Sequence, residues 1–72
     1  MDIIIEFIVP FSEPVELKIY NSLGQIVKDY TMEEPEPGLN QISINAALFS
    51  KGVYNYKIIF SGNEKTKRFI IE

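Results

Sequence analysis

Residues 15–27, which read VELKIYNSLGQIV, decide the fold class of this chain. In the first six, apolar side chains alternate with polar ones: Val15, Leu17 and Ile19 against Glu16, Lys18 and Tyr20. A period of two puts the apolar set on one face of a β-strand, which indicates a half-buried strand. The next four residues, Asn21–Gly24, favour a turn because asparagine and glycine tolerate turn conformations. The stretch therefore predicts a strand, a tight reversal and the start of a second strand.

The same period of two continues on both sides of this stretch. Before it, residues 3–9 have an apolar face, and Pro10 ends the pairing because proline lacks the N–H that a ladder needs. After it, we expect strands at residues 25–31, 40–45, 52–60 and 65–72. For residues 25–31 both faces are mixed, so their inward side stays open. The strand with the clearest pattern is 52–60, whose apolar face consists of Tyr54, Tyr56, Ile58 and Phe60.

Turn and capping residues separate these strands. Residues 33–38 contain two prolines and end in glycine, which predicts a polar loop. Residues 61–64 predict a hairpin turn, and Asn45 is placed to cap a short helical turn over 46–49. Six or seven short strands spaced about 8–12 residues apart are typical of an antiparallel β-sandwich. The sequence thus predicts an all-β fold in a single domain, residues 1–72.

Composition excludes several classes of function. A chain of 72 residues is too short to enclose a large active site. It has no cysteine and no histidine, and so lacks disulfides, thiol chemistry and the commonest general base and transition-metal ligand. The net charge of −3 disfavours a nucleic-acid partner. Glu6 interrupts the apolar N-terminal residues, so neither a signal peptide nor a membrane-spanning segment is expected.

Two groups of residues could in principle carry chemistry. Three carboxylates lie in one loop, Glu33, Glu34 and Glu36, and carboxylates are ligands for Ca²⁺. Their spacing is not that of an EF-hand, so a solvated acidic loop is the preferred interpretation. Serines such as Ser50, next to Lys51, have no histidine to activate them and no sign of an oxyanion hole. We therefore predict no enzyme activity, no metal site and no cofactor.

Aromatic and basic residues suggest two binding surfaces. An exposed row of the four tyrosines could stack on sugar rings, but packing of Tyr54, Tyr56 and Phe60 in the core is favoured. Which tyrosines are exposed stays open. Lys65 and Lys67 share one face of the last strand and Arg68 lies on the other, a small patch for an acidic partner or simply for solvent.

Five blocks of the sequence, in order along the chain, are similar to the motifs of one domain family. The longest is residues 15–27, which is similar to the pattern V-x-L-x-I-Y-N-x-L-G-Q-x-V. Residues 7–10 (FIVP) resemble an F-x-L-P strand end, and residues 37–40 (PGLN) resemble an x-G-x-N/H strand entry. Residues 48–54 (LFSKGVY) resemble a block that places glycine two residues before tyrosine, and residues 67–71 (KRFII) resemble a terminal basic and apolar motif. Together the blocks resemble the C-terminal sorting domains of the bacterial type IX (Por) secretion system.

This resemblance implies a small Ig-like antiparallel β-sandwich of six to seven strands at the C-terminal end of a larger precursor. The family's domains follow an N-terminal cargo domain and travel through the periplasm to the cell surface or the medium. Their implied partners are the outer-membrane secretion machinery and a sortase-like peptidase. The family's last motifs imply recognition residues at Gly52, Tyr54, Lys67, Arg68, Phe69, Ile70 and Ile71. The long block implies a structural turn motif at Tyr20, Asn21, Leu23, Gly24 and Gln25.

The alternative function is an Ig-like accessory binding or spacer module of a cell-surface protein, one version of which contacts carbohydrate. A structural module of the flagellar hook-capping type is a third hypothesis, because one fold serves many functions. Exposed strand edges also predict that the domain could form a homodimer. The sequence leaves open the identity of the cargo and the point of cleavage.

Overall fold

The computed structural model describes residues 2–72, so Met1 lies outside the described part. It contains six β-strands and one turn of 3₁₀ helix. Their bounds, in chain order, are β1 (Asp2–Val9), β2 (Val15–Tyr20), β3 (Ile26–Met32), β4 (Gly38–Asn45), η1 (Ala46–Leu48), β5 (Gly52–Phe60) and β6 (Asn63–Ile71).

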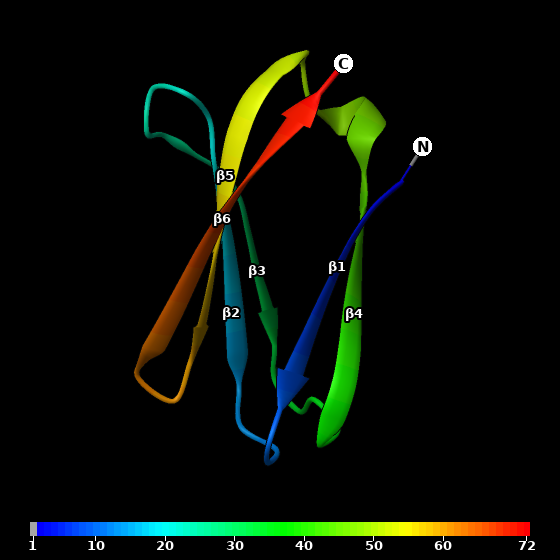
Figure 1. Cartoon of the computed structure of the whole chain (residues 1–72), viewed down its shortest axis with the longest axis vertical. Coiled ribbons are helices and arrows are strands. Elements are labelled where there is room, and N and C mark those ends of the chain that lie inside the picture. The colour runs from blue at the N-terminus through cyan, green and yellow to red at the C-terminus, as the bar shows by residue number, and fades with distance from the viewer. Residues whose placement is uncertain (1) are drawn as a thin grey trace.

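The strands form two antiparallel sheets that pack face to face (Figure 1). The smaller sheet pairs β1 with β4, and the larger has the order β3-β2-β5-β6. The chain crosses between sheets three times: from β1 to β2, from β3 to β4, and through η1 from β4 to β5. The predicted all-β sandwich is confirmed, with six strands.

The core lies between the two sheets and follows the period of two in the sequence. Val15, Leu17 and Ile19 of β2 have no exposed surface, because β2 is an inner strand of the larger sheet. The buried residues packed together around β2 come from both sheets and are Ile5, Leu17, Ile19, Ile42, Ile44, Tyr54 and Ile71. The stretch that decides the fold class therefore also supplies the centre of the core.

The boundaries of β2 and β5 are those predicted, and three other strands differ from the predicted ones by one or two residues. β3 runs one residue later than predicted, while β4 and β6 each begin two residues earlier. The pairing register of β2 with β3 settles the inward face of β3, which carries Lys28, Tyr30 and Met32 opposite Ile19, Leu17 and Val15. Even so, β3 is exposed along most of its length because it is an edge strand of the larger sheet.

Two local predictions can be read directly in the structure. The side chain of Asn45 accepts a hydrogen bond from the Ala47 N–H and caps η1, as predicted. The predicted hairpin turn joins β5 and β6, with Ser61 and Gly62 both at positive φ. The loop 33–38 differs in one respect, because its Pro35 is buried rather than solvated.

Candidate functional site

The predicted turn motif is held together by one asparagine side chain. The Oδ1 atom of Asn21 accepts hydrogen bonds from the N–H groups of Leu23 (2.9 Å) and Gln25 (3.0 Å). Its Nδ2 donates to Oε1 of Gln25 at 3.0 Å, and its backbone N–H donates to the Gln25 carbonyl at 2.9 Å. Gly24 closes the turn with φ +80°, a conformation that costs any residue with a Cβ. This geometry accounts for the asparagine and the glycine of the motif without a binding partner.

A second asparagine orders the entry to β4. The Nδ2 atom of Asn40 donates to the carbonyl oxygens of Glu36 (2.7 Å) and Gly38 (3.2 Å). The connection from β3 is thus fastened to the strand that follows it. Asn40 belongs to the block 37–40, so this block too has a role inside the fold.

Tyr54 joins η1 to the larger sheet. Its hydroxyl donates a hydrogen bond of 2.7 Å to the carbonyl of Ser50, and its ring packs against Phe49 and Phe69 at centroid distances of 5.5 and 5.6 Å. Two residues earlier, Gly52 begins β5 with φ +152°, a backbone conformation that residues with a Cβ rarely adopt. Gly52 and Tyr54, two of the residues predicted for recognition, therefore have structural roles at the start of β5.

The two faces of β6 divide the rest of the predicted recognition set. Phe69 and Ile71 point inward, half-buried and buried, opposite Tyr54 and Gly52 of β5. Ile70 lies on the outer face opposite Val53, and these two side chains are 60% and 40% exposed. Arg68 shares that outer face and is exposed. The outer face of β6 thus presents one guanidinium beside an apolar pair.

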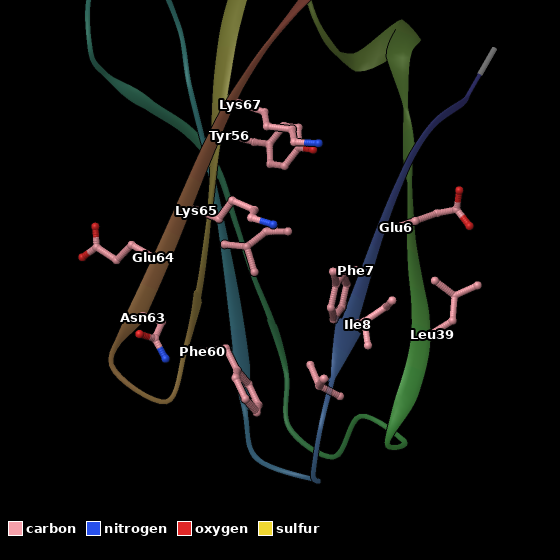
Figure 2. Close-up of a pocket in the computed structure, with 12 residues that line it drawn as sticks. Glu6, Phe7, Ile8, Leu39, Tyr56, Phe60, Asn63, Glu64, Lys65 and Lys67 are labelled. Atoms are coloured by element: carbon pink, nitrogen blue, oxygen red, sulfur yellow. The ribbon is translucent and has the colours of Figure 1, made fainter.

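Lys67 lies on the inner face of β6, together with Lys65. Both line a groove of about 540 Å³ between β1 and the β5–β6 hairpin (Figure 2). Figure 2 shows the two lysines pointing from β6 towards β1, with Phe7 of β1 pointing back towards them. The other residues that line it are Glu6, Ile8, Val9, Leu39, Tyr56, Ile58, Phe60, Asn63 and Glu64.

Sequence reasoning missed this groove although the signal was present. It placed Lys65 and Lys67 on one strand face, as a patch for an acidic partner or for solvent, but predicted no groove beside them. The two lysines are in phase with Phe69 and Ile71, at a spacing of two residues, so they share the inward face of the sheet. The sequence also places Tyr56, Ile58 and Phe60 on one face of β5. In the structure these three side chains are half-buried and form the apolar floor of the groove.

Charges on the larger sheet are partly paired. Lys57 lies 3.4 Å from Glu64 and 5.7 Å from the centre of the Tyr20 ring, and Lys18 lies 3.9 Å from Glu16. Over residues 2–72 no carboxylate lies within 4.0 Å of the ammonium groups of Lys65 and Lys67 or of the Arg68 guanidinium. Burial beside the groove raises the pKa of the Tyr56 hydroxyl above its usual value of 10.0. The groove therefore combines two unpaired cations with an apolar floor.

The remaining candidates from the sequence are dispersed over the surface. Glu33, Glu34 and Glu36 are exposed, and within residues 2–72 no three acidic side chains gather to hold a metal ion. Ser50 and Lys51 are exposed as well. Of the four tyrosines, Tyr54 is buried, Tyr20 and Tyr56 are half-buried and Tyr30 is exposed, so no exposed tyrosine row forms. In the part of the chain that the structure describes, no helix is long and apolar enough to span a bilayer.

Comparison with known proteins gives one match. The family model described as "Secretion system C-terminal sorting domain" matches residues 2–72. No curated protein and no solved structure matches the chain. The matched family is a sorting-signal family and not a known catalytic one, and the match does not favour an accessory or spacer module.

Domains of this family mark proteins that are exported to the cell surface or secreted, as the C-terminal part of a precursor. The match extends over the five sequence blocks, and the hydrogen bonds of Asn21, Asn40 and Tyr54 explain three of them as parts of one β-sandwich. The chain belongs to the family of C-terminal sorting domains of the type IX secretion system, and it functions as a C-terminal sorting signal.

Proposed function

We propose that the outer-membrane secretion machinery recognises this sorting domain through the C-terminal strand β6, chiefly through Arg68 and Ile70. The observation that carries the proposal is the difference in exposure within the predicted recognition set. Tyr54 and Ile71 are buried and Gly52 and Phe69 are half-buried, whereas Lys67, Arg68 and Ile70 are exposed. Exposed side chains are available to a partner, and buried ones keep β6 in position. In this proposal the domain is an address without catalytic activity of its own.

The position of β6 supports this role. Among the strands of the described part of the chain, β6 pairs only with β5, so its other edge offers unpaired backbone groups. A partner strand that pairs with such an edge gains affinity from the backbone and specificity from the neighbouring side chains. Arg68 supplies a fixed charge, and Ile70 with Val53 supplies exposed apolar surface.

The test is export of a periplasmic fluorescent reporter with residues 1–72 fused to its C-terminus, in a bacterium with a working type IX system. The double variant Arg68→Ala/Ile70→Thr removes the two outward side chains and introduces neither glycine nor proline into the strand. We expect at least a ten-fold loss of exported reporter, with secondary structure and melting temperature close to those of the parent domain. Normal export of this variant would overturn the proposal.

The matched control lies on the other edge of the same sheet. Ile26 of β3 is 51% exposed, and Lys28 of the same strand is exposed. The variant Ile26→Thr/Lys28→Ala makes equivalent losses on an edge strand, and we expect it to be exported like the parent. If both variants fail, loss of a general surface property rather than recognition of β6 is the explanation.

The sortase-like peptidase and the homodimer remain proposals. A peptidase needs a mobile segment, so we propose that it cleaves the precursor outside the six strands, whose backbones are paired. Mass spectrometry of the released C-terminal fragment gives the cleavage point, and a cut inside a strand would contradict this. For homodimerisation through strand edges, light scattering over a range of concentrations distinguishes a dimer from the 8.3 kDa monomer.

A further inference from the structure

The groove between β1 and the β5–β6 hairpin is bounded by a strand with a free edge. Within residues 2–72, β1 pairs with β4 on one side, over eight residue pairs, and has no strand on its other side. That free edge lies beside the groove, since Glu6, Phe7, Ile8 and Val9 of β1 line it. The backbone N–H and C=O groups of an unpaired edge are a template for an added strand.

The smaller sheet leaves part of the larger one uncovered. It has two strands facing four, and the inner face of β6 changes from buried at Ile71 to exposed at Lys67 and Lys65. The neighbouring positions on β5, Tyr56 and Ile58, are half-buried (Figure 2). The smaller sheet faces the larger one, and packed sheets lie about 10 Å apart. One more strand beside β1 would extend the smaller sheet and so cover these positions.

The charges in the groove indicate the chemistry of that strand. Lys65 and Lys67 are two residues apart on one face, and within residues 2–72 neither forms an ion pair. Glu64 belongs to the opposite face of β6, where it pairs with Lys57, and Glu6 accepts a hydrogen bond of 3.1 Å from Gln41. An extended strand repeats its side chains on one face every two residues, the same spacing as the lysines.

We propose that this groove binds an extended segment of a partner protein, which adds as a third strand to the free edge of β1. The segment places two carboxylates, two residues apart, over Lys65 and Lys67, and its next inward side chains are apolar and cover Phe7, Ile58 and Phe60. The groove is a surface distinct from the outer face of β6. The inference rests on the proposed function only in that Lys67 belongs to the recognition set as well.

This domain's own acidic segments do not fit the groove. The inward positions of β1 from a second copy carry Ile3, Ile5 and Phe7 rather than carboxylates. Glu34 and Glu36 have the right spacing, but their loop is held in its own fold by the buried Pro35 and by the hydrogen bond of 2.7 Å from Asn40 to the Glu36 carbonyl. Charge and backbone together therefore favour a flexible acidic segment from another protein.

Peptide titration followed by NMR tests the proposal with a defined probe. The probe is an acetylated and amidated peptide of the length of β1, Thr-Glu-Thr-Glu-Thr-Val-Thr-Val, together with its reverse sequence because the strand direction is unassigned. We expect one of the two to bind with a Kd below about 1 mM at low salt and to shift the amide signals of β1. Absence of binding by both peptides at about 1 mM would overturn the proposal.

Three controls separate the contributions of groove charge, net charge and backbone pairing to binding of the probe. Lys65→Glu/Lys67→Glu should weaken binding at least about ten-fold, and a probe with lysine in place of glutamate should recover it. Lys28→Glu/Lys51→Glu makes the same change in net charge away from the groove and should bind like the parent. Two probes carry N-methyl groups, each along a different edge, and the one methylated on the edge that faces β1 should not bind because it cannot pair with β1. Equal binding by the lysine variants or by both methylated probes would contradict the proposal.

The result of the peptide titration does not depend on the result of the secretion assay. Arg68→Ala/Ile70→Thr leaves the groove unchanged and should bind the probe with the parent's affinity. Normal probe binding by a variant that is not exported would leave both proposals intact. Export of that variant together with normal probe binding would remove the proposed role of Arg68 and Ile70 and keep the groove.

Discussion

Replacement of Asn21 by alanine tests whether the long sequence motif is a part of the fold or a contact for a partner. The substitution removes the Oδ1 atom, which accepts hydrogen bonds from the N–H groups of Leu23 and Gln25. A net contribution of about 0.5–1.5 kcal/mol per hydrogen bond is usual, and the turn is exposed, so water replaces part of each. We expect the free energy of unfolding to fall by about 1–2 kcal/mol.

That loss is large for this domain. A chain of 72 residues has a total stability of about 4–11 kcal/mol at usual values per residue. For 72 residues the entropy of unfolding is about 0.15 kcal/mol/K at usual values per residue. A loss of about 1–2 kcal/mol should therefore lower the melting temperature by about 7–13 °C. Thermal and urea unfolding followed by circular dichroism measure both quantities.

Asn21→Asp is the matched control. Aspartate keeps an acceptor for both N–H groups and loses only the exposed donor to Oε1 of Gln25, so its cost should stay below about 0.5 kcal/mol. If Asn21→Ala unfolded like the parent and its reporter were no longer exported, the structural explanation of the motif would be refuted. Loss of export in proportion to the lost stability would agree with it.

Three further perturbations test the fold. Leu17→Ala leaves a cavity at a site with no exposed surface and should cost about 2–5 kcal/mol, measured by urea unfolding; a cost below about 1 kcal/mol would contradict the central place of β2. Tyr54→Phe removes the hydrogen bond to the Ser50 carbonyl and keeps the ring contacts, so unfolding should become easier by about 0.5–1.5 kcal/mol while export persists. The pKa of Tyr56 is raised in the folded state by burial, so stability should be retained below about pH 10 and decline as the pH rises through the raised pKa. The decline should be smaller in Tyr56→Phe, and identical pH profiles of the two proteins would argue against burial of that hydroxyl.

The sequence was sufficient for the elements whose signal is local. The alternation in β2 fixes its two faces because side chains in a strand repeat every two residues. The cap on η1 and the β5–β6 turn depend on residues close together in the sequence, such as Asn45 and Gly62, and both were predicted.

What the sequence could not supply depends on pairing between distant segments. The order β3-β2-β5-β6 brings β2 beside β5 across the whole middle of the chain, and no local pattern specifies that neighbour. Exposure depends on this order. Tyr30 and Tyr54 occupy similar strand patterns, yet Tyr30 lies on the edge strand β3 and Tyr54 lies in the core. For the same reason the sequence showed that Lys65 and Lys67 share a face but not that the smaller sheet leaves this face open.

The most direct test of the account is the distribution of the periplasmic reporter fused to residues 1–72, compared between a strain with a type IX system and one without it. The quantity measured is the fraction of reporter on the cell surface and in the medium. We predict that most of it leaves the periplasm in the first strain and stays there in the second. The same distribution in both strains would contradict the conclusion that this domain is a type IX sorting signal.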